Sequence, residues 1–185
     1  RYVSRAGLKL AGAAKTFNLN FRGKTVLDVG SSTGGFTDFA LQHDANKVYA
    51  VDVGTDQLHP SLRGNKRIEL YEKTDIRDFV PNETPDMVVI DVSFISLRQI
   101  LPHVAKIVDK NTTIVAMVKP QFEAQRQQLT RGGVVKNDGV RRAILREFEQ
   151  WARANFIIID KADSEIKGAH GNLERFYILR KAGSC

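Results

Sequence analysis

The stretch Asp28-Val29-Gly30-Ser31-Ser32-Thr33-Gly34-Gly35-Phe36 decides the fold of this chain. It follows an apolar run at residues 25–29 and precedes a helical pattern that begins near residue 35. Glycines allow positive φ angles and a close approach of backbone to ligand, so such a strand–turn–helix is typical of nucleoside-like ligand sites. The glycine spacing differs from the G-x-G-x-x-G of dinucleotide enzymes, and no Walker-type lysine follows. We therefore expect a ligand without a pyrophosphate, and Asp28 suits a cationic group on it, such as an amine.

Outward from this turn, apolar runs of strand length alternate with amphipathic helical patterns. Strands are expected at residues 25–29, 48–52, 67–71, 86–91, 112–119, 156–160 and 175–179. Helices are expected at residues 4–17, 35–42, 94–108 and 138–154, with Pro102 kinking or shortening the third. This alternation predicts an α/β, Rossmann-like fold: a mostly parallel seven-stranded sheet with helices on both faces and an antiparallel closing pair. Residues 120–136 form a long loop, which makes them a candidate functional loop.

Length and composition limit the kind of protein this is. The 185 residues suit a single domain, residues 1–185, and 42% hydrophobic with 26% charged residues is ordinary for a globular chain. The formal net charge of +7 fits a polyanionic partner without requiring one. No apolar run approaches the ~20 residues that span a bilayer, so we expect no membrane association. The lone cysteine, Cys185, excludes a disulfide framework and favours a reducing, cytoplasmic setting.

Charged residues follow several of the expected strands. Because the carboxyl ends of parallel strands meet at one edge of a sheet, we expect these side chains to lie beside the glycine turn. Asp52 stands about twenty residues after the turn, where an acid binds ribose hydroxyls in this topology. Asp75 either accepts from an adenine amino group or caps the next turn. Asp91 ends the fourth strand, and Lys119 ends the fifth as either a snorkelling side chain or a partly desolvated amine with a chemical role.

A series of longer segments occurs in a fixed order along the chain. They are Ser4-Arg5-Ala6-Gly7-Leu8-Lys9-Leu10, the turn extended to Thr37-Asp38, Val51-Asp52-Val53-Gly54, Asp91-Val92-Ser93-Phe94-Ile95-Ser96-Leu97, Val118-Lys119-Pro120-Gln121-Phe122-Glu123 and Gly171-Asn172-Leu173-Glu174. Together they resemble the TlyA (haemolysin A) family of FtsJ-like, S-adenosylmethionine-dependent rRNA 2′-O-methyltransferases, over essentially the whole chain. The chain departs from the family pattern in having Ser31 in place of alanine, Thr55-Asp56 in place of Tyr-Gly, and Gln125 in place of glycine.

The resemblance implies a methyltransferase fold, S-adenosylmethionine as cofactor, and ribosomal RNA or a ribosomal subunit as partner. We expect this cofactor to be held by the residues of the glycine turn and the strand-end acids, namely Asp28, Gly30, Ser31, Ser32, Gly34, Gly35, Phe36, Asp52 and Asp75. The resemblance also implies a catalytic tetrad of Lys9, Asp91, Lys119 and Glu174. Lys9 and Glu174 enter only in this way, because by themselves they look like a solvated helix residue and a strand-edge charge. Members usually carry an N-terminal S4 RNA-binding domain, so we expect this chain to be a fragment that lacks it.

The implied chemistry needs few parts. A ribose 2′-hydroxyl is a weak nucleophile at neutral pH and needs help to lose its proton. Lys119 either takes that proton, if its amine is neutral, or stabilises the developing alkoxide, if it is charged. Asp91 and Glu174 would orient Lys119 and Lys9. No metal is expected, because the histidines show no ligand spacing.

Basic residues are expected to cluster near this edge of the sheet, where they would suit RNA phosphates, although a solvated basic surface explains them equally well. They are Arg1, Arg5, Lys9, Lys66, Arg67, Arg126, Arg131, Lys136, Arg141, Arg142 and Lys167. The sequence does not identify a stacking platform for bases. Two rival functions stay open at this point: a membrane-active haemolysin, as the family's older name suggests, and a catalytically inactive RNA-binding module with a methyltransferase fold. An oxidoreductase is weaker, because the glycine spacing fits poorly.

Overall fold

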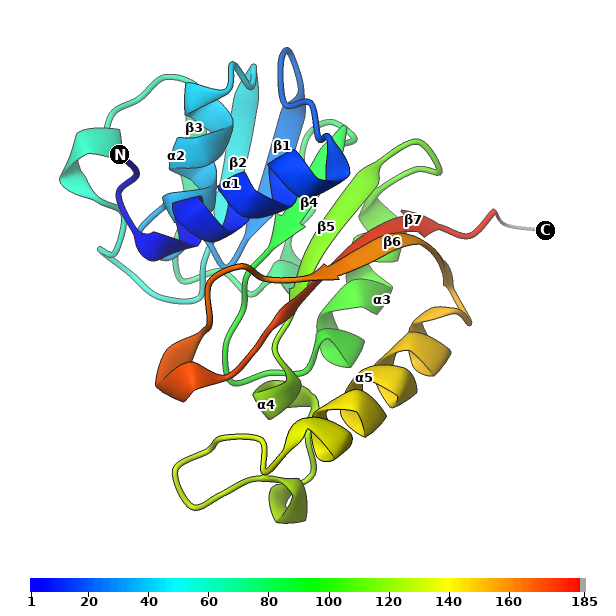
Figure 1. Cartoon of the computed structure of the whole chain (residues 1–185). Coiled ribbons are helices and arrows are strands. Elements are labelled where there is room, and N and C mark those ends of the chain that lie inside the picture. The colour runs from blue at the N-terminus through cyan, green and yellow to red at the C-terminus, as the bar shows by residue number, and fades with distance from the viewer. Residues whose placement is uncertain (184–185) are drawn as a thin grey trace.

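The computed structural model describes residues 1–183, and Cys185 lies outside the described residues. A 7-stranded sheet runs through the molecule in the order β3-β2-β1-β4-β5-β7-β6 (Figure 1). The strands are β1 (Thr25–Val29), β2 (Lys47–Val51), β3 (Ile68–Tyr71), β4 (Met87–Ile90), β5 (Thr113–Val118), β6 (Phe156–Asp163) and β7 (Arg175–Lys181). Strands β1 to β5 pair in parallel, and β7 is antiparallel to both β5 and β6. The predicted α/β architecture with an antiparallel closing pair is thus confirmed.

Helices cover both faces of this sheet. They are α1 (Arg5–Phe17), α2 (Gly35–Gln42), α3 (Leu97–Ile107), the single turn α4 (Pro120–Glu123) and α5 (Asp138–Ala152). Helices α1 and α2 pack on one face, and α3 and α5 pack on the other (Figure 1). Both faces of the central strands are buried, which explains why those strands are continuous apolar runs.

The two apolar cores follow the alternation of side chains along each strand. On β1, Val26 faces the α1–α2 layer, whereas Leu27 and Val29 face the α3–α5 layer. The strand order reverses direction at β1, whose neighbours are β2 on one side and β4 on the other. Open α/β sheets bind their ligands at such a switch point, outside the carboxyl ends of the strands.

The third long helix begins later than the sequence predicts. It starts at Leu97, with the Ser96 hydroxyl accepting from the backbone N–H of Arg98 at 3.0 Å, and it continues through Pro102. The predicted start at residue 94 is wrong because Phe94 has a φ of 63°, which a right-handed helix does not allow. Residues 92–96 instead form a loop at the carboxyl edge.

The segment 120–136 is more ordered than a plain loop. It contains α4, a 3-10 turn at Arg126–Gln128, and a bridge between Leu129 and Val135 that closes a short hairpin. The loop lies at the carboxyl edge of the sheet, together with the 3-10 turn at Ala169–Gly171 (Figure 1). The fold therefore brings both segments to the edge where the glycine turn opens.

Candidate active site at the carboxyl edge of the sheet

Two glycines of the turn are required by its backbone. Gly30 has a φ of 80° and Gly34 a φ of 100°, conformations that other residues rarely adopt. A Cβ at Gly30 would also collide with the carbonyl oxygen of Asp91, so β1 and β4 can approach closely here. Glycine is required at position 35 for a different reason, because a side chain there would collide with Ser4 at the start of α1.

Asp28 lies beneath this turn in full burial. Its Oδ2 accepts from the Thr37 hydroxyl at 2.7 Å, while its Oδ1 is buried without a partner among residues 1–183. Burial raises the pKa of Asp28 to about 7, and the Asp91 and Asp52 carboxylates add to the shift. The Thr37 hydrogen bond opposes it. Ser31, at the position where the family pattern has alanine, also has a buried Oγ without a partner in the described chain.

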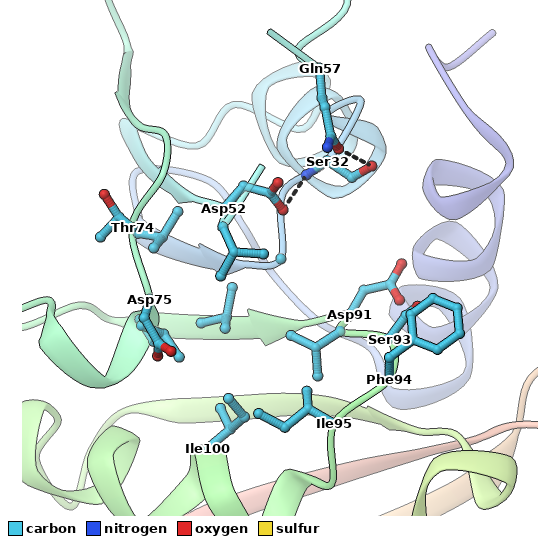
Figure 2. Close-up of a pocket in the computed structure, with 16 residues that line it drawn as sticks. Ser32, Asp52, Gln57, Thr74, Asp75, Asp91, Ser93, Phe94, Ile95 and Ile100 are labelled. Carbon is cyan, nitrogen blue, oxygen red and sulfur yellow. Dashed lines mark hydrogen bonds between the residues drawn. The ribbon is translucent and has the colours of Figure 1, made fainter. Parts of the chain in front are cut away.

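A pocket of about 340 Å³ opens between the ends of β1, β2 and β4. Its wall contains Asp52, Asp75 and Asp91 with apolar side chains such as Ile95 and Ile100, and no lysine, arginine or histidine among residues 1–183 lines it (Figure 2). Such a wall offers acceptors for hydroxyl and amino groups and no cation for a phosphate. The pocket thus fits a nucleoside with a positive charge and without phosphates.

The backbone holds the Asp52 carboxylate in place at one end of this pocket. One oxygen accepts from Ser32 N at 3.2 Å and the other from Gly54 N at 2.9 Å. The Ser32 hydroxyl in turn donates to Gln57, as the dashed lines in Figure 2 show. Asp52 is therefore fixed before any ligand arrives, as suits a carboxylate that receives ribose hydroxyls.

Asp75 lines the same pocket and also caps a helical turn. Its carboxylate accepts from Arg77 N at 2.9 Å and makes an ion pair with the Arg77 guanidinium at 2.7 Å. These hydrogen bonds to Arg77 lower the pKa of Asp75 to about 2. The capping role is thus present in the structure, and the predicted contact with an adenine amino group stays a prediction.

A second hollow of about 310 Å³ lies on the other side of the turn. The start of α1 and the turn residues Ser31, Ser32, Gly35 and Phe36 line it, together with Asp91. Asp91 lines both hollows and so marks the place where they meet. Asp28 and Gly34 line neither hollow. They stabilise the turn from its buried side.

The four predicted tetrad residues form two ion pairs. Lys119 Nζ lies 2.6 Å from Asp91 Oδ1, and it also donates to the Ser93 hydroxyl at 3.0 Å. Lys9 Nζ lies 3.0 Å from Glu174 Oε1, and their side chains are only 12% and 2% exposed. The second pair joins α1 to the start of β7 across 165 residues of sequence.

Several polar residues of the site were not predicted from the sequence. Thr37 supports Asp28, Gln57 supports Ser32, Ser93 contacts Lys119, and Gln121 donates to Glu174. Ser93 and Gln121 stand within two residues of Asp91 and Lys119, inside segments already quoted for the family resemblance. Proximity to a strand-end charge was the signal that could have found them.

The basic residues divide between the two edges of the sheet. Lys66 and Arg67 precede β3, and Arg67 donates to the Ala45 carbonyl, so both lie at the amino edge, away from the site. Their expected place at the site edge is wrong, because they stand at the wrong end of a parallel strand. Arg141 is held by Asp163 and the Leu173 carbonyl. Of the basic residues expected at the site, Arg5, Arg126, Arg131, Lys136, Arg142 and Lys167 are exposed and lie on segments at the site edge.

Within residues 1–183, no group of three or more histidine, cysteine, aspartate or glutamate side chains has the arrangement of a metal site. Over the same residues, no helix combines the length and apolar character needed to cross a membrane.

The fold and the site together define an α/β protein with a pocket at the carboxyl edge of its sheet that suits a nucleoside-like cofactor. The family model of the FtsJ-like methyltransferases matches residues 2–182, and the chain belongs to this family. The family and the fold imply S-adenosylmethionine as the cofactor.

Relatives cover nearly the whole chain. The Campylobacter jejuni 23S rRNA (cytidine-2′-O)-methyltransferase TlyA is 41% identical over 185 residues, which are 97% of this chain and 71% of TlyA. YqxC of Bacillus subtilis is 42% identical over 94% of this chain, but the chain spans 64% of YqxC. A solved structure named "Putative hemolysin from Streptococcus thermophilus" superposes with a TM-score of 0.94 at 43% identity, over 100% of this chain and 68% of that one.

Proposed function

We propose that the protein transfers a methyl group from S-adenosylmethionine to a ribose 2′-hydroxyl of ribosomal RNA. The observation that carries the proposal is the position of Asp91. This carboxylate lines the acidic pocket and contacts Lys119 Nζ, an arrangement that supports a reaction beside a cofactor bound in that pocket. The TlyA relative of Campylobacter, by its name, performs such a reaction on 23S rRNA, which supports the same reaction class here.

The pocket residues suit the parts of this cofactor. Asp52 would receive the ribose hydroxyls, and Asp75 with Ile76, Ile95 and Ile100 would surround the adenine. The turn at Gly30–Gly34 with Asp28 behind it suits the amino-acid end, whose ammonium is attracted by carboxylates. When bound, the cofactor supplies an electrophilic methyl group on a sulfonium.

Lys119 would act directly on the attacking hydroxyl. If its amine is neutral, it accepts the 2′-hydroxyl proton; if it is an ammonium, it stabilises the developing alkoxide. Asp91 and Ser93 fix the position of its Nζ at 2.6 and 3.0 Å. Lys9, paired with Glu174, adds a second positive charge for the ribose or its phosphate.

The mouth of the site carries an aromatic pair suited to RNA. The Phe94 side chain is 89% exposed and lines the pocket, and its ring packs on Phe122 with centroids 4.9 Å apart. Exposed rings at a site mouth bind unstacked bases, which is how single-stranded RNA is commonly recognised. We infer that Phe94 receives the base of the target nucleotide.

The test mixes the protein, methyl-labelled S-adenosylmethionine and ribosomal RNA, offered as intact subunits and as free RNA. Label should enter RNA and survive as a 2′-O-methyl nucleoside after digestion. Lys119→Met should lower the transfer rate at least about a hundredfold while leaving calorimetric cofactor binding intact. Lys106→Met, on the exposed side of α3, is the matched control.

The two parts of the proposal fail separately. Absence of transfer to every RNA by the unaltered protein would contradict the function. Transfer that Lys119→Met leaves undiminished would contradict the role of the lysine.

A further inference from the structure

Gln121 links the Lys9–Glu174 ion pair to the chain segment that carries Lys119. Its side-chain amide donates from Nε2 to Glu174 Oε2 at 3.1 Å, and both residues are buried, at 7% and 1% exposure. The other oxygen of Glu174 accepts from Lys9. Gln121 lies on α4, and Lys119 is the residue that precedes this short helix. The same segment therefore carries both the lysine that would act on the hydroxyl and a donor to Glu174, the carboxylate of the other ion pair.

The surroundings of Glu174 leave this carboxylate few other partners. The backbone of Gly168 packs so closely on it that a Cβ at Gly168 would collide with Oε2. Among residues 1–183, Lys9 and Gln121 are the side chains that donate to it. Without Gln121, one oxygen of a buried carboxylate would lack a donor, and its orientation would depend on Lys9 alone.

Gln121 is not placed for stability alone. Its own Oε1 is buried without a partner in the described chain, which costs free energy that a core residue ordinarily avoids. Its neighbour Glu123 acts elsewhere, because its carboxylate accepts from Ser96 at 2.6 Å and Leu97 N at 2.8 Å and so holds the loop before α3. The two polar residues of α4 thus support different parts of the site.

We propose that Gln121 is a positioning residue for methyl transfer. It holds the Glu174 carboxylate, and through it the Lys9 ammonium, at a fixed place relative to Lys119. Transfer to a hydroxyl requires alignment of groups within fractions of an ångström, so loss of this link slows chemistry rather than binding. The inference rests on the proposed 2′-O-methyl transfer.

The first test compares Gln121→Met with Gln150→Met, an exposed glutamine on α5. Neither side chain lines the cofactor pocket, so calorimetry should give unchanged cofactor affinity and thereby report an intact fold. At saturating RNA, the single-turnover rate of Gln121→Met should fall at least about tenfold, with the RNA concentration for half-maximal rate nearly unchanged. A rate equal to that of Gln150→Met would overturn the inference.

A second pair of variants separates positioning from a general structural role. In a Glu174→Ala background, Gln121→Met should produce no further loss of transfer rate, because the partner of Gln121 is gone.

The Gln121→Glu variant tests the same contact through its pH dependence. Its new carboxyl can donate to Glu174 only when protonated, so its transfer rate relative to the unaltered protein should fall as the pH rises. Additive losses, or a loss independent of pH, would contradict the proposal. Inactivity of the unaltered protein on every RNA would instead count against the proposed function.

Discussion

Val118 of β5 and Arg175 of β7 are directly paired in the antiparallel register. One residue beyond this pair, Lys119 and Glu174 therefore lie opposite each other at the carboxyl edge, where directly opposed side chains share a face. The antiparallel strand β7 thus places the Glu174 carboxylate at the same edge of the sheet where the parallel strands β2 and β4 place Asp52 and Asp91. By alternation, this face is the one covered by α1, which contributes Lys9.

The Lys9–Glu174 pair gives a prediction about stability. Removing one partner leaves a buried charge uncompensated, so Lys9→Met or Glu174→Leu alone should cost about 3–5 kcal/mol of unfolding free energy. The double variant should cost clearly less than the sum. The exposed pair Arg22–Asp44, with side chains 79% and 64% exposed, is the control and should show a coupling below about 1 kcal/mol. Urea denaturation measures both cycles, and additivity at Lys9–Glu174 would show that the two charges do not depend on each other.

The sequence predicts those site residues that follow from strand periodicity. Asp52, Asp91 and Lys119 each come directly after a buried apolar strand, and parallel strands bring such ends together without further information. The glycines of the turn are equally local, because a positive φ is a property of the chain at that point.

Other site residues depend on tertiary placement, which local patterns do not contain. Lys9 lies on an amphipathic helix and looks solvated until β7 brings Glu174 to it. Phe94 continues an apolar helical pattern, yet its backbone is left-handed and its ring is exposed. Gln121 resembles any polar loop residue until its buried partner is known. Without the structure, only the family resemblance identifies Lys9 and Glu174 as site residues.

Phe94 lines the cofactor pocket at its mouth, and we expect its exposed ring to contribute more to RNA binding than to cofactor binding. Phe94→Ala removes the exposed ring, and we expect a weakening of RNA binding of about tenfold, because stacking contributes ~1–3 kcal/mol per base. Phe94→Trp keeps a π-face and should bind nearly as well as phenylalanine. Fluorescence anisotropy with labelled RNA measures both variants, and calorimetry with S-adenosylmethionine is the control. Equal RNA affinity of the alanine and phenylalanine proteins would exclude a stacking role.

The hairpin after α4 should supply part of the salt dependence of RNA binding. Its segment 124–137 contains Arg126, Arg131 and Lys136 and no acidic residue, and all three are exposed. Replacing the three by glutamine should reduce the slope of log affinity against log salt by about 2, at ~0.7 per phosphate contact on single strands.

A matched triple variant has the same change in net charge at the opposite edge. Arg22, Lys66 and Lys110 precede β1, β3 and β5, and each is exposed. Their replacement by glutamine should leave the slope close to that of the unaltered protein. If both triple variants lose the same slope, RNA binds through overall charge and not through the hairpin.

Asp28 should make the stability of the protein depend on pH in a defined direction. Its pKa rises from an ordinary value of 3.8 to about 7 because the carboxyl is buried, so the folded protein keeps a proton that the unfolded chain releases. The stability that this proton contributes is fully present below about pH 4 and is lost as the pH rises through 7. The Asp28→Asn variant has no carboxyl group to ionise at this position, so it does not lose this stability as the pH rises. Urea denaturation should therefore show the variant gaining stability relative to the unaltered protein between pH 4 and 8, by at most about 4 kcal/mol.

The Thr37→Val variant tests whether the Asp28 pKa causes this dependence of stability on pH. The Thr37 hydroxyl donates to Asp28 Oδ2 and favours the ionised carboxylate, so its removal should raise the pKa of Asp28 further. The pH range over which stability falls should then extend upward, whereas Asp28→Asn should abolish it. Parallel stability curves for the unaltered protein and Asp28→Asn would mean that Asp28 ionises alike in the folded and unfolded chains. The carboxyl beneath the glycine turn would then be an ordinary solvated acid, which its complete burial argues against.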